Sequence, residues 1–170
     1  MASTTITEQE AAMKSRKEIA MENFTKGYNC AQSLVLAFAD LLEIDTDRLL
    51  KMASSFGGGM GRLREVCGSV SGMFLVAGLL YGYSGPESGD VKNDHYARIQ
   101  DLAHAFEEKN GSIVCRELLG LTVRHDIPVA EARTEEYYRK RPCRELIGMA
   151  ADLLDQLIIR QNEISTGGNR

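Results

Sequence analysis

Long hydrophobic runs are missing from this sequence. The longest apolar stretch, residues 73–83, is too short to cross a bilayer and holds two glycines. The polar N-terminus also lacks a cationic segment followed by an apolar run, so we expect no secretory signal. Together these absences predict a cytoplasmic protein with no membrane span.

An excess of charge of one sign is missing as well. The chain carries 20 lysines and arginines against 24 aspartates and glutamates, which gives a net charge of −4, and the two signs are interspersed. A nucleic-acid-binding protein would show a basic stripe, and a membrane-surface protein would show a polybasic patch. The charge pattern therefore argues against nucleic acid and membrane surfaces as partners.

Strand-like alternation of apolar and polar residues does not persist anywhere along the chain. Apolar residues instead recur at helical spacing, and 170 residues suffice for one domain with its own core. We therefore predict an all-α, single-domain multi-helix bundle over residues 1–164, followed by a disordered tail at 165–170. The expected helices cover about 7–25, 30–41, 46–56, 65–81, 93–109, 112–120, 131–140 and 142–161.

Capping signals mark several of these helix starts. Thr7 with Glu10 and Asn29 with Gln32 fit the capping-box pattern, and Asp45 fits an N-cap. A glycine-rich loop at 56–62 leads into the helix at 65–81, which is apolar nearly all round and should therefore be central and buried. The first half of that helix holds small residues that lower helix propensity, so we expect another helix or a bound group to approach closely there. These small residues are Gly68, Ser69, Ser71 and Gly72.

The four cysteines are widely spaced, and none belongs to a C-x-x-C pair, which excludes zinc-ribbon, zinc-finger and thioredoxin patterns. Each lies in or near the first turn of an expected helix, where backbone N–H groups and the helix dipole stabilise a thiolate. A short repeat, C-R-E-L-(L/I)-G, adds Arg116 and Arg144 directly after two of them, and these arginines would favour ionisation. The candidate catalytic residues are therefore Cys30, Cys67, Cys115 and Cys143. Free cysteine is also a common buried hydrophobe, so inert core cysteines remain the alternative.

The glycine-rich loop lacks the Gly-Lys-Ser/Thr ending of a phosphate-binding loop, and no strand precedes it. We expect a tight turn with positive φ that brings backbone N–H groups near Cys67. The candidate residues for holding a bound group are Gly58, Gly59, Gly61 and Gly68. The sequence identifies no cofactor, and its scattered histidines should be exposed residues rather than ligands: His95, His104 and His125.

Several segments together resemble a known family. Residues 66–72, Val-Cys-Gly-Ser-Val-Ser-Gly, are similar to the C-G-A-x-x-G signature of the C-GCAxxG-C-C family of redox-active proteins, with Ser69 where the signature has alanine. Residues 29–33 and 111–120 resemble the first and third cysteine segments of the family, and Cys143 resembles the fourth. The resemblance covers about 24–157. It implies a helical fold in which the four cysteines are the functional set.

Three functions remain open from the sequence. The first is thiol-based redox or electron-transfer chemistry with an unidentified redox partner, in which Cys67 is the most reactive thiol and the other three cysteines are resolving partners. The second is an iron–sulfur or metal-binding module, because four thiolates are the right number and type of ligand. The third is a structural protein with buried cysteines that forms a homo-oligomer through its apolar segment 73–81. Whether the chain is an enzyme is left undecided.

Overall fold

The computed structural model describes residues 13–86 and 89–167 as a helical bundle. Within these residues no strand forms, and Val66 and Val114 share only an isolated antiparallel bridge. The prediction of an all-α bundle is confirmed. The helices are α1 (Arg16–Thr25), α2 (Cys30–Ala37), the 3-10 turn η1 (Ala39–Leu41), α3 (Thr46–Ser54), α4 (Gly57–Met60), α5 (Gly68–Tyr81), α6 (Gly89–Asn110), α7 (Cys115–Leu118), α8 (Glu135–Lys140) and α9 (Cys143–Gly167).

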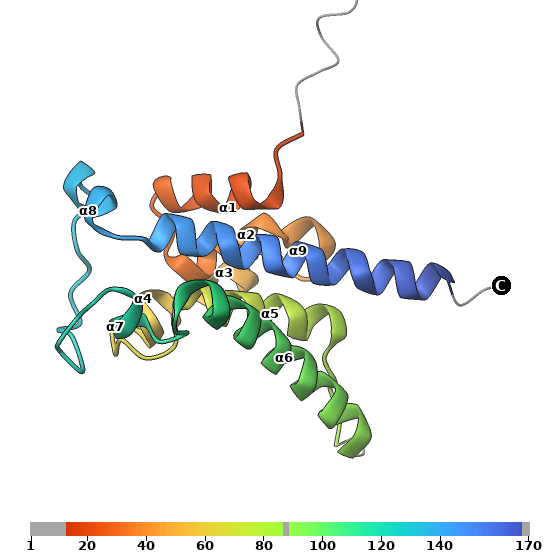
Figure 1. Cartoon of the computed structure of the whole chain (residues 1–170). Helices are drawn as coiled ribbons and strands as arrows, with labels where there is room; N and C mark the ends of the chain where they lie inside the picture. The colour runs from red at the N-terminus through yellow and green to blue at the C-terminus, as the bar shows by residue number, and fades with distance from the viewer. Residues whose placement is uncertain (1–12, 87–88, 168–170) are drawn as a thin grey trace, which may run out of the picture.

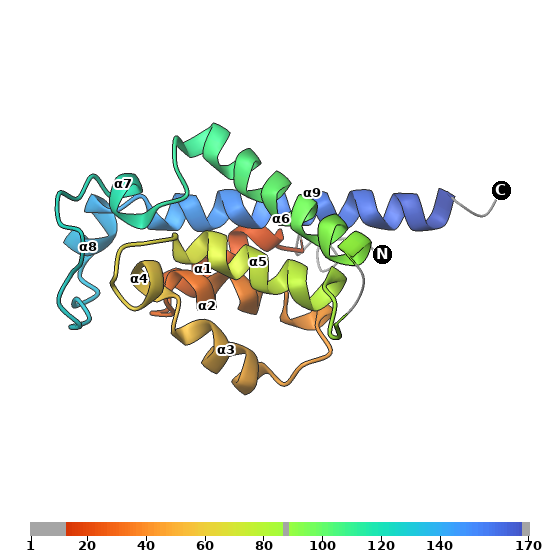
Figure 2. The same cartoon turned by 90° about the horizontal axis from the view of Figure 1, so that it is seen from below.

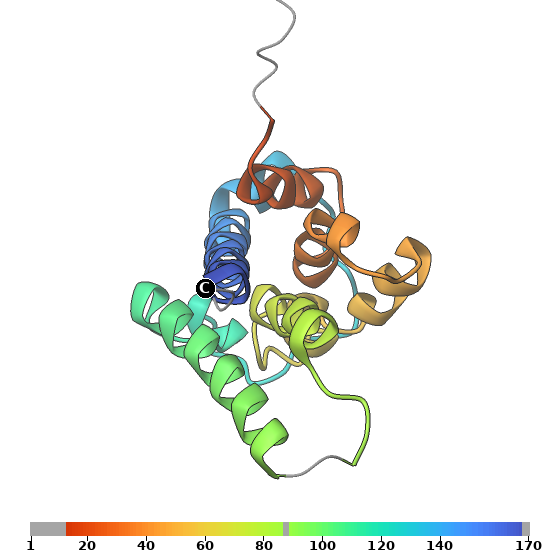
Figure 3. The ribbon, with the colours of Figure 1, turned by 90° about the vertical axis from the view of Figure 1, so that its right-hand side faces the viewer.

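The long helix α9 runs along the bundle and packs against α1, α2, α5 and α6 (Figure 1). Seen end-on, α1, α2, α5 and α9 surround a common centre, and α6 lies outside them against α5 and α9 (Figure 3). The view from below shows α6 inclined to α9, with α3 on the opposite side of the bundle (Figure 2). Fully buried apolar side chains from three of these helices fill the centre: Leu34, Val35, Val70, Met73, Ile147 and Leu154.

Two of the predicted caps are confirmed. The Asn29 side chain accepts from the Gln32 backbone N–H at 2.9 Å, and the Gln32 side chain accepts from the Asn29 backbone N–H. The Asp45 side chain accepts from the Arg48 backbone N–H in the first turn of α3. The predicted box of Thr7 and Glu10 lies outside the described residues. Residues 13–15 are not helical, and α1 begins at Arg16 after a capping box formed by Ser15 and Glu18.

The small residues of α5 face α2 at close range, as predicted. A Cβ on Gly68 would lie 2.9 Å from the Cys30 Cβ, and a Cβ on Gly72 would lie 3.0 Å from the Ala31 carbonyl oxygen. Helix α2 therefore occupies the space that side chains would need. Only the first half of α5 is buried throughout, because Leu79 in its second half is 43% exposed, so the prediction of a helix buried all round is wrong there.

Several helix boundaries differ from the prediction: α2 ends at Ala37 instead of 41, α5 begins at Gly68 instead of 65, and α8 begins at Glu135 instead of 131. Helix α6 begins at Gly89, before the expected start near 93. The cap of α7 is Val114, because Ser112 accepts from the Val114 amide and so lies before the helix start. Helix α9 continues past 161 to Gly167, into the expected tail, of which 168–170 lie outside the described residues. Across the residues described, no helix combines the length and the apolarity that crossing a membrane requires.

Candidate functional site

All four cysteines lie at the N-terminal ends of helices, as predicted. Cys30, Cys115 and Cys143 are the first residues of α2, α7 and α9, and Cys67 is the N-cap of α5. These helix starts lie at the same end of the bundle, on the left in Figure 1. Exposed N–H groups of several helices, drawn from distant parts of the chain, therefore surround the thiols.

Cys30 and Cys143 line the same cavity, and their thiols interact strongly enough to shift each other's pKa in opposite directions. The interaction with the Cys143 thiol is the main reason that the pKa of Cys30 is lowered to about 6. The backbone N–H groups of Gly58 and Cys30 and the Arg133 guanidinium also favour the ionised Cys30 sulfur. The same interaction raises the pKa of Cys143 far above the ordinary value, because the protonated Cys143 thiol stabilises the neighbouring thiolate. One member of the pair is thus set to ionise and the other to stay protonated.

The other two thiols are held neutral. Burial and the neighbouring Cys30 charge together raise the pKa of Cys67 to about 12, although the Cys67 thiol also donates to Ser69 Oγ at 3.5 Å. Burial also raises the pKa of Cys115, although Arg64 Nη1 lies 3.8 Å from its sulfur and opposes that effect. The four thiols therefore interact electrostatically, and a thiolate forms most readily at Cys30.

The glycine-rich loop is a turn of left-handed residues, which confirms the predicted positive φ. Gly58, Gly59 and Gly61 have φ of 66°, 69° and 63°. The backbone N–H of Gly58 helps to lower the pKa of Cys30, and a Cβ on Gly59 would lie 2.6 Å from the Cys115 Cβ. The thiols that these glycines contact are therefore Cys30 and Cys115, whereas the sequence pattern predicts Cys67.

The remaining predicted glycines have different surroundings. Gly61 is exposed, with only the Ser55 carbonyl oxygen near the position of its Cβ, at 3.9 Å. Gly68 packs directly on the Cys30 Cβ. Of the four glycines predicted to hold a bound group, Gly58 alone lines the cavity beside the thiols.

The arginines around the thiols are ones that sequence reasoning missed. Arg64 is only 2% exposed and bonds to Asp126 at 2.8 Å, and Arg133 donates to the Tyr28 carbonyl oxygen while lying over the Phe24 ring at 4.5 Å. Both reach the site from loops, with no helical spacing to link them to a cysteine. The one available signal was that Arg62 and Arg64 directly follow the glycine turn.

The predicted arginines have other partners. Arg116 forms an ion pair with Glu65 at 3.0 Å, and Arg144 lies 3.7 Å from Glu145. The charges that act on the thiols come from Arg64, Arg133 and Arg141 instead. The assignment of Arg116 and Arg144 to thiol activation was therefore wrong, because both side chains turn toward carboxylates.

The thiols and arginines share a cavity of about 210 Å³, called here the thiol pocket. Cys67 is not among its lining residues in the described part of the chain. Its wall includes three sulfurs, four guanidinium groups, a glutamate and a tyrosine. They are Cys30, Cys115, Cys143, Arg62, Arg64, Arg133, Arg141, Glu131 and Tyr137.

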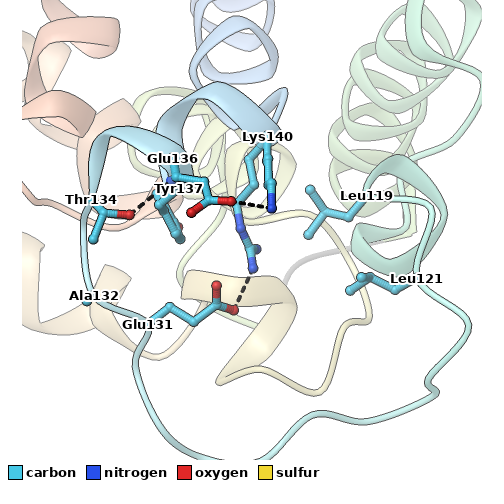
Figure 4. Close-up of a pocket in the computed structure, with 9 residues that line it drawn as sticks. Leu119, Leu121, Glu131, Ala132, Thr134, Glu136, Tyr137 and Lys140 are labelled. Carbon is cyan, nitrogen blue, oxygen red and sulfur yellow. Dashed lines mark hydrogen bonds and ion pairs between the residues drawn. The ribbon is translucent and has the colours of Figure 1, made fainter.

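A second hollow of about 510 Å³ lies beside the thiol pocket, between α8 and the segment after α7. Figure 4 shows Leu119 and Leu121 on one side of it and Glu136 and Lys140 on the other. The Glu131 carboxylate, bound to Arg141 at 2.5 Å, lines both spaces, as do Leu119 and Tyr137. The hollow thus adjoins the thiol pocket on its α8 side.

Neither the histidines nor a carboxylate cluster adds a metal site. His104 and His125 are exposed, as expected, while His95 is partly buried. Over residues 13–86 and 89–167, no group of three or more histidine, cysteine, aspartate and glutamate side chains is arranged to hold a metal ion.

Comparison with known proteins identifies the family. The family model described as "Putative redox-active protein (C_GCAxxG_C_C)" matches residues 28–157. Searches of curated proteins and of solved structures found no significant match. The family match spans most of the chain and includes all four cysteines. The protein therefore belongs to the C_GCAxxG_C_C family of putative redox-active proteins.

Proposed function

We propose that the protein is a dithiol–disulfide redox protein in which Cys30 is the attacking thiolate and Cys143 is its partner. The observation that carries this proposal is that Cys30 and Cys143, which are far apart in the sequence, line the same open cavity, where their thiols interact and the pKa of Cys30 is lowered. Thiol–disulfide exchange needs an ionised sulfur and a second sulfur within reach, and this pair supplies both. Membership of a redox-active family supports the same conclusion.

The exchange proceeds in two steps. The Cys30 thiolate attacks one sulfur of a substrate disulfide, which breaks the substrate S–S bond, forms a mixed disulfide and releases the first thiolate. Cys143 then transfers its proton to the first released thiolate and attacks the Cys30 sulfur, which releases the second thiolate and leaves a Cys30–Cys143 disulfide. The substrate gains two electrons and the protein loses two, so the cycle closes when a reductant restores the dithiol.

Cys30 replaces Cys67 as the favoured nucleophile in this proposal. Cys67 is buried, its pKa is raised to about 12, and it does not line the thiol pocket, whereas Cys30 is partly exposed and has a lowered pKa. A neutral buried thiol is a poor nucleophile. Cys67 and Cys115 are proposed to keep the surroundings of the pair compact and apolar.

A redox titration tests the proposal. The protein is purified anaerobically, equilibrated with glutathione mixtures of increasing oxidising strength, trapped by alkylation and mapped by mass spectrometry. We expect one intramolecular disulfide joining Cys30 to Cys143 in the wild type and in Cys67→Ala, and none in Cys143→Ala. If no disulfide forms between strongly reducing and mildly oxidising conditions, or if a different pair forms it, the proposal is wrong.

A further inference from the structure

The charges of the thiol pocket do not balance. Arg62, Arg64, Arg133 and Arg141 line it, and the carboxylates that pair with them are those of Asp126 and Glu131. A thiolate at Cys30 adds one further negative charge, which still leaves one positive charge in excess. Charge complementarity thus favours an occupant with an anionic group.

Two guanidinium nitrogens of the arginines that line the thiol pocket are buried without a hydrogen-bond acceptor in the described structure. They are Arg133 Nη1 and Arg64 Nε. The Arg133 side chain donates from Nη2 to the Tyr28 carbonyl oxygen and lies over the rings of Phe24 and Tyr137, and these contacts leave its Nη1 buried without an acceptor. Buried donors normally have an acceptor, and a bound carboxylate would supply one.

The size of the cavity restricts the occupant further. About 210 Å³ is below the usual range for drug-sized ligands, so the pocket suits a small molecule of a few heavy atoms on each side of a reactive bond. Three sulfur atoms lie in its wall beside the arginines. The reacting group and the anionic group of the occupant must therefore be close together in one small molecule.

We propose that the thiol pocket takes a small organic disulfide that carries a carboxylate, which Arg133 and Arg64 recognise while Cys30 attacks the sulfur. The inference rests on the proposed function and follows its steps. Cys30 displaces one carboxylate-bearing thiolate, Cys143 then displaces the second, and the two electrons pass from the protein dithiol to the substrate disulfide. Recognition of the carboxylate holds the disulfide against the Cys30 sulfur.

The test compares two disulfides that differ only in charge. Pre-reduced protein is mixed anaerobically with dithiodipropionate or with its uncharged diamide, and the rate of Cys30–Cys143 disulfide formation is measured by quenched mass spectrometry. A free thiolate repels a carboxylate, so an unassisted thiol prefers the diamide. We expect the wild type to prefer the dicarboxylate by about tenfold, and added salt to reduce that preference.

Two arginine variants test which residue recognises the carboxylate. Arg133→Gln should abolish the preference, and Arg139→Gln should leave it unchanged, because Arg139 is an exposed residue of α8 that does not line the pocket. The ratio of the two rates is the readout, because loss of Arg133 also raises the pKa of Cys30 and so slows both reactions alike. If Arg133→Gln does not fold, the wild type is tested at increasing salt. A dicarboxylate preference that falls with salt supports the proposal, and a preference that salt does not change contradicts it.

The outcomes separate the two proposals. Oxidation of the pair by both disulfides at equal rates, or faster by the diamide, overturns the carboxylate recognition and leaves the proposed function intact. A preference that survives in Arg133→Gln also overturns the assignment of recognition to this arginine. If neither disulfide oxidises the Cys30–Cys143 pair, both proposals are overturned.

Discussion

At the scale of single residues, the interaction of two neighbouring cysteines gives them opposite properties. The interaction favours the charged form of Cys30 and the protonated form of Cys143, so the pKa of the first falls and that of the second rises. Neighbouring N–H groups add to the effect because they face the same sulfur. The reactivity of Cys30 is therefore set by its surroundings and can be measured directly.

The alkylation rate of Cys30 should depend on pH with a low midpoint. Because its pKa is lowered to about 6, the thiolate fraction should rise through that region, well below the ordinary cysteine value of about 8.5. Iodoacetamide labelling followed by peptide mass spectrometry measures the profile. Cys143→Ala should move the midpoint upward, and Cys67→Ala should leave it close to the wild type. A wild-type midpoint at the ordinary cysteine value would contradict this account.

Gly59→Ala should destabilise the fold more than Gly61→Ala. Both glycines have positive φ, which costs an alanine about 1 kcal/mol, but the added Cβ at Gly59 would also lie 2.6 Å from the Cys115 Cβ. At Gly61 the nearest atom is 3.9 Å away. Urea unfolding should show a loss of about 2–3 kcal/mol for the first variant and about 1 kcal/mol for the second. Equal losses would mean that the turn moves away from Cys115 without cost.

At the scale of elements, the contact between α2 and α5 brings two of the thiols together. Gly68 lets the start of α5 approach Cys30, and Gly72 lets the next turn approach Ala31. Ala31 and Leu34, which pack on Gly72, are fully buried, so the two helices have little room to separate there. The small side chains of α5 therefore determine how close Cys67 comes to Cys30.

Substitution of the two helical glycines Gly72 and Gly78 should have opposite effects. A Cβ at Gly72 would lie 3.0 Å from the Ala31 carbonyl oxygen and 3.2 Å from the Leu34 side chain, so Gly72→Ala should destabilise by about 1–3 kcal/mol. At Gly78 nothing lies within 4 Å, so Gly78→Ala should stabilise by about 0.5–1 kcal/mol through helix propensity. Urea denaturation of the reduced proteins gives both values. A stable Gly72→Ala variant would show that α2 and α5 can shift apart.

Local signals predicted the helices better than their ends. Asn29 and Asp45 are caps whose side chains bond to amides three residues away, so the nearby sequence contains all of the required information. The extension of α9 to Gly167 was missed, although neither glycine nor proline interrupts the sequence between 161 and 166. The partial exposure of α5 was also missed, since it depends on which helices pack around it.

At the scale of the whole molecule, the site is assembled from distant segments. Placing the cysteines at helix starts was predictable, because each start has a local signal. The arginines were not, because Arg64, Arg133 and Arg141 reach the pocket only after the loop that contains Asp126 folds back on the glycine turn. Arg116 and Arg144 directly follow cysteines in the sequence, but their side chains lie near the carboxylates of Glu65 and Glu145.

Oxidation of the Cys30–Cys143 pair should stabilise the whole bundle. The disulfide would join the starts of α2 and α9 and close a loop of about 100 residues, which reduces the entropy of the unfolded chain. Urea unfolding of the oxidised protein should show a gain of about 2–4 kcal/mol over the reduced protein. Cys30→Ser under the same conditions should show no gain. A less stable oxidised form would mean that the Cys30–Cys143 disulfide strains the starts of α2 and α9.

The convergence of α2 and α9 has a consequence for protein synthesis. Cys30 emerges from the ribosome early and Cys143 late, so a growing chain carries the first sulfur without the neighbour that lowers its pKa. Until α9 docks, we expect the Cys30 thiol to ionise like an ordinary cysteine. The surroundings of Cys30 are thus complete only when the last helix is in place.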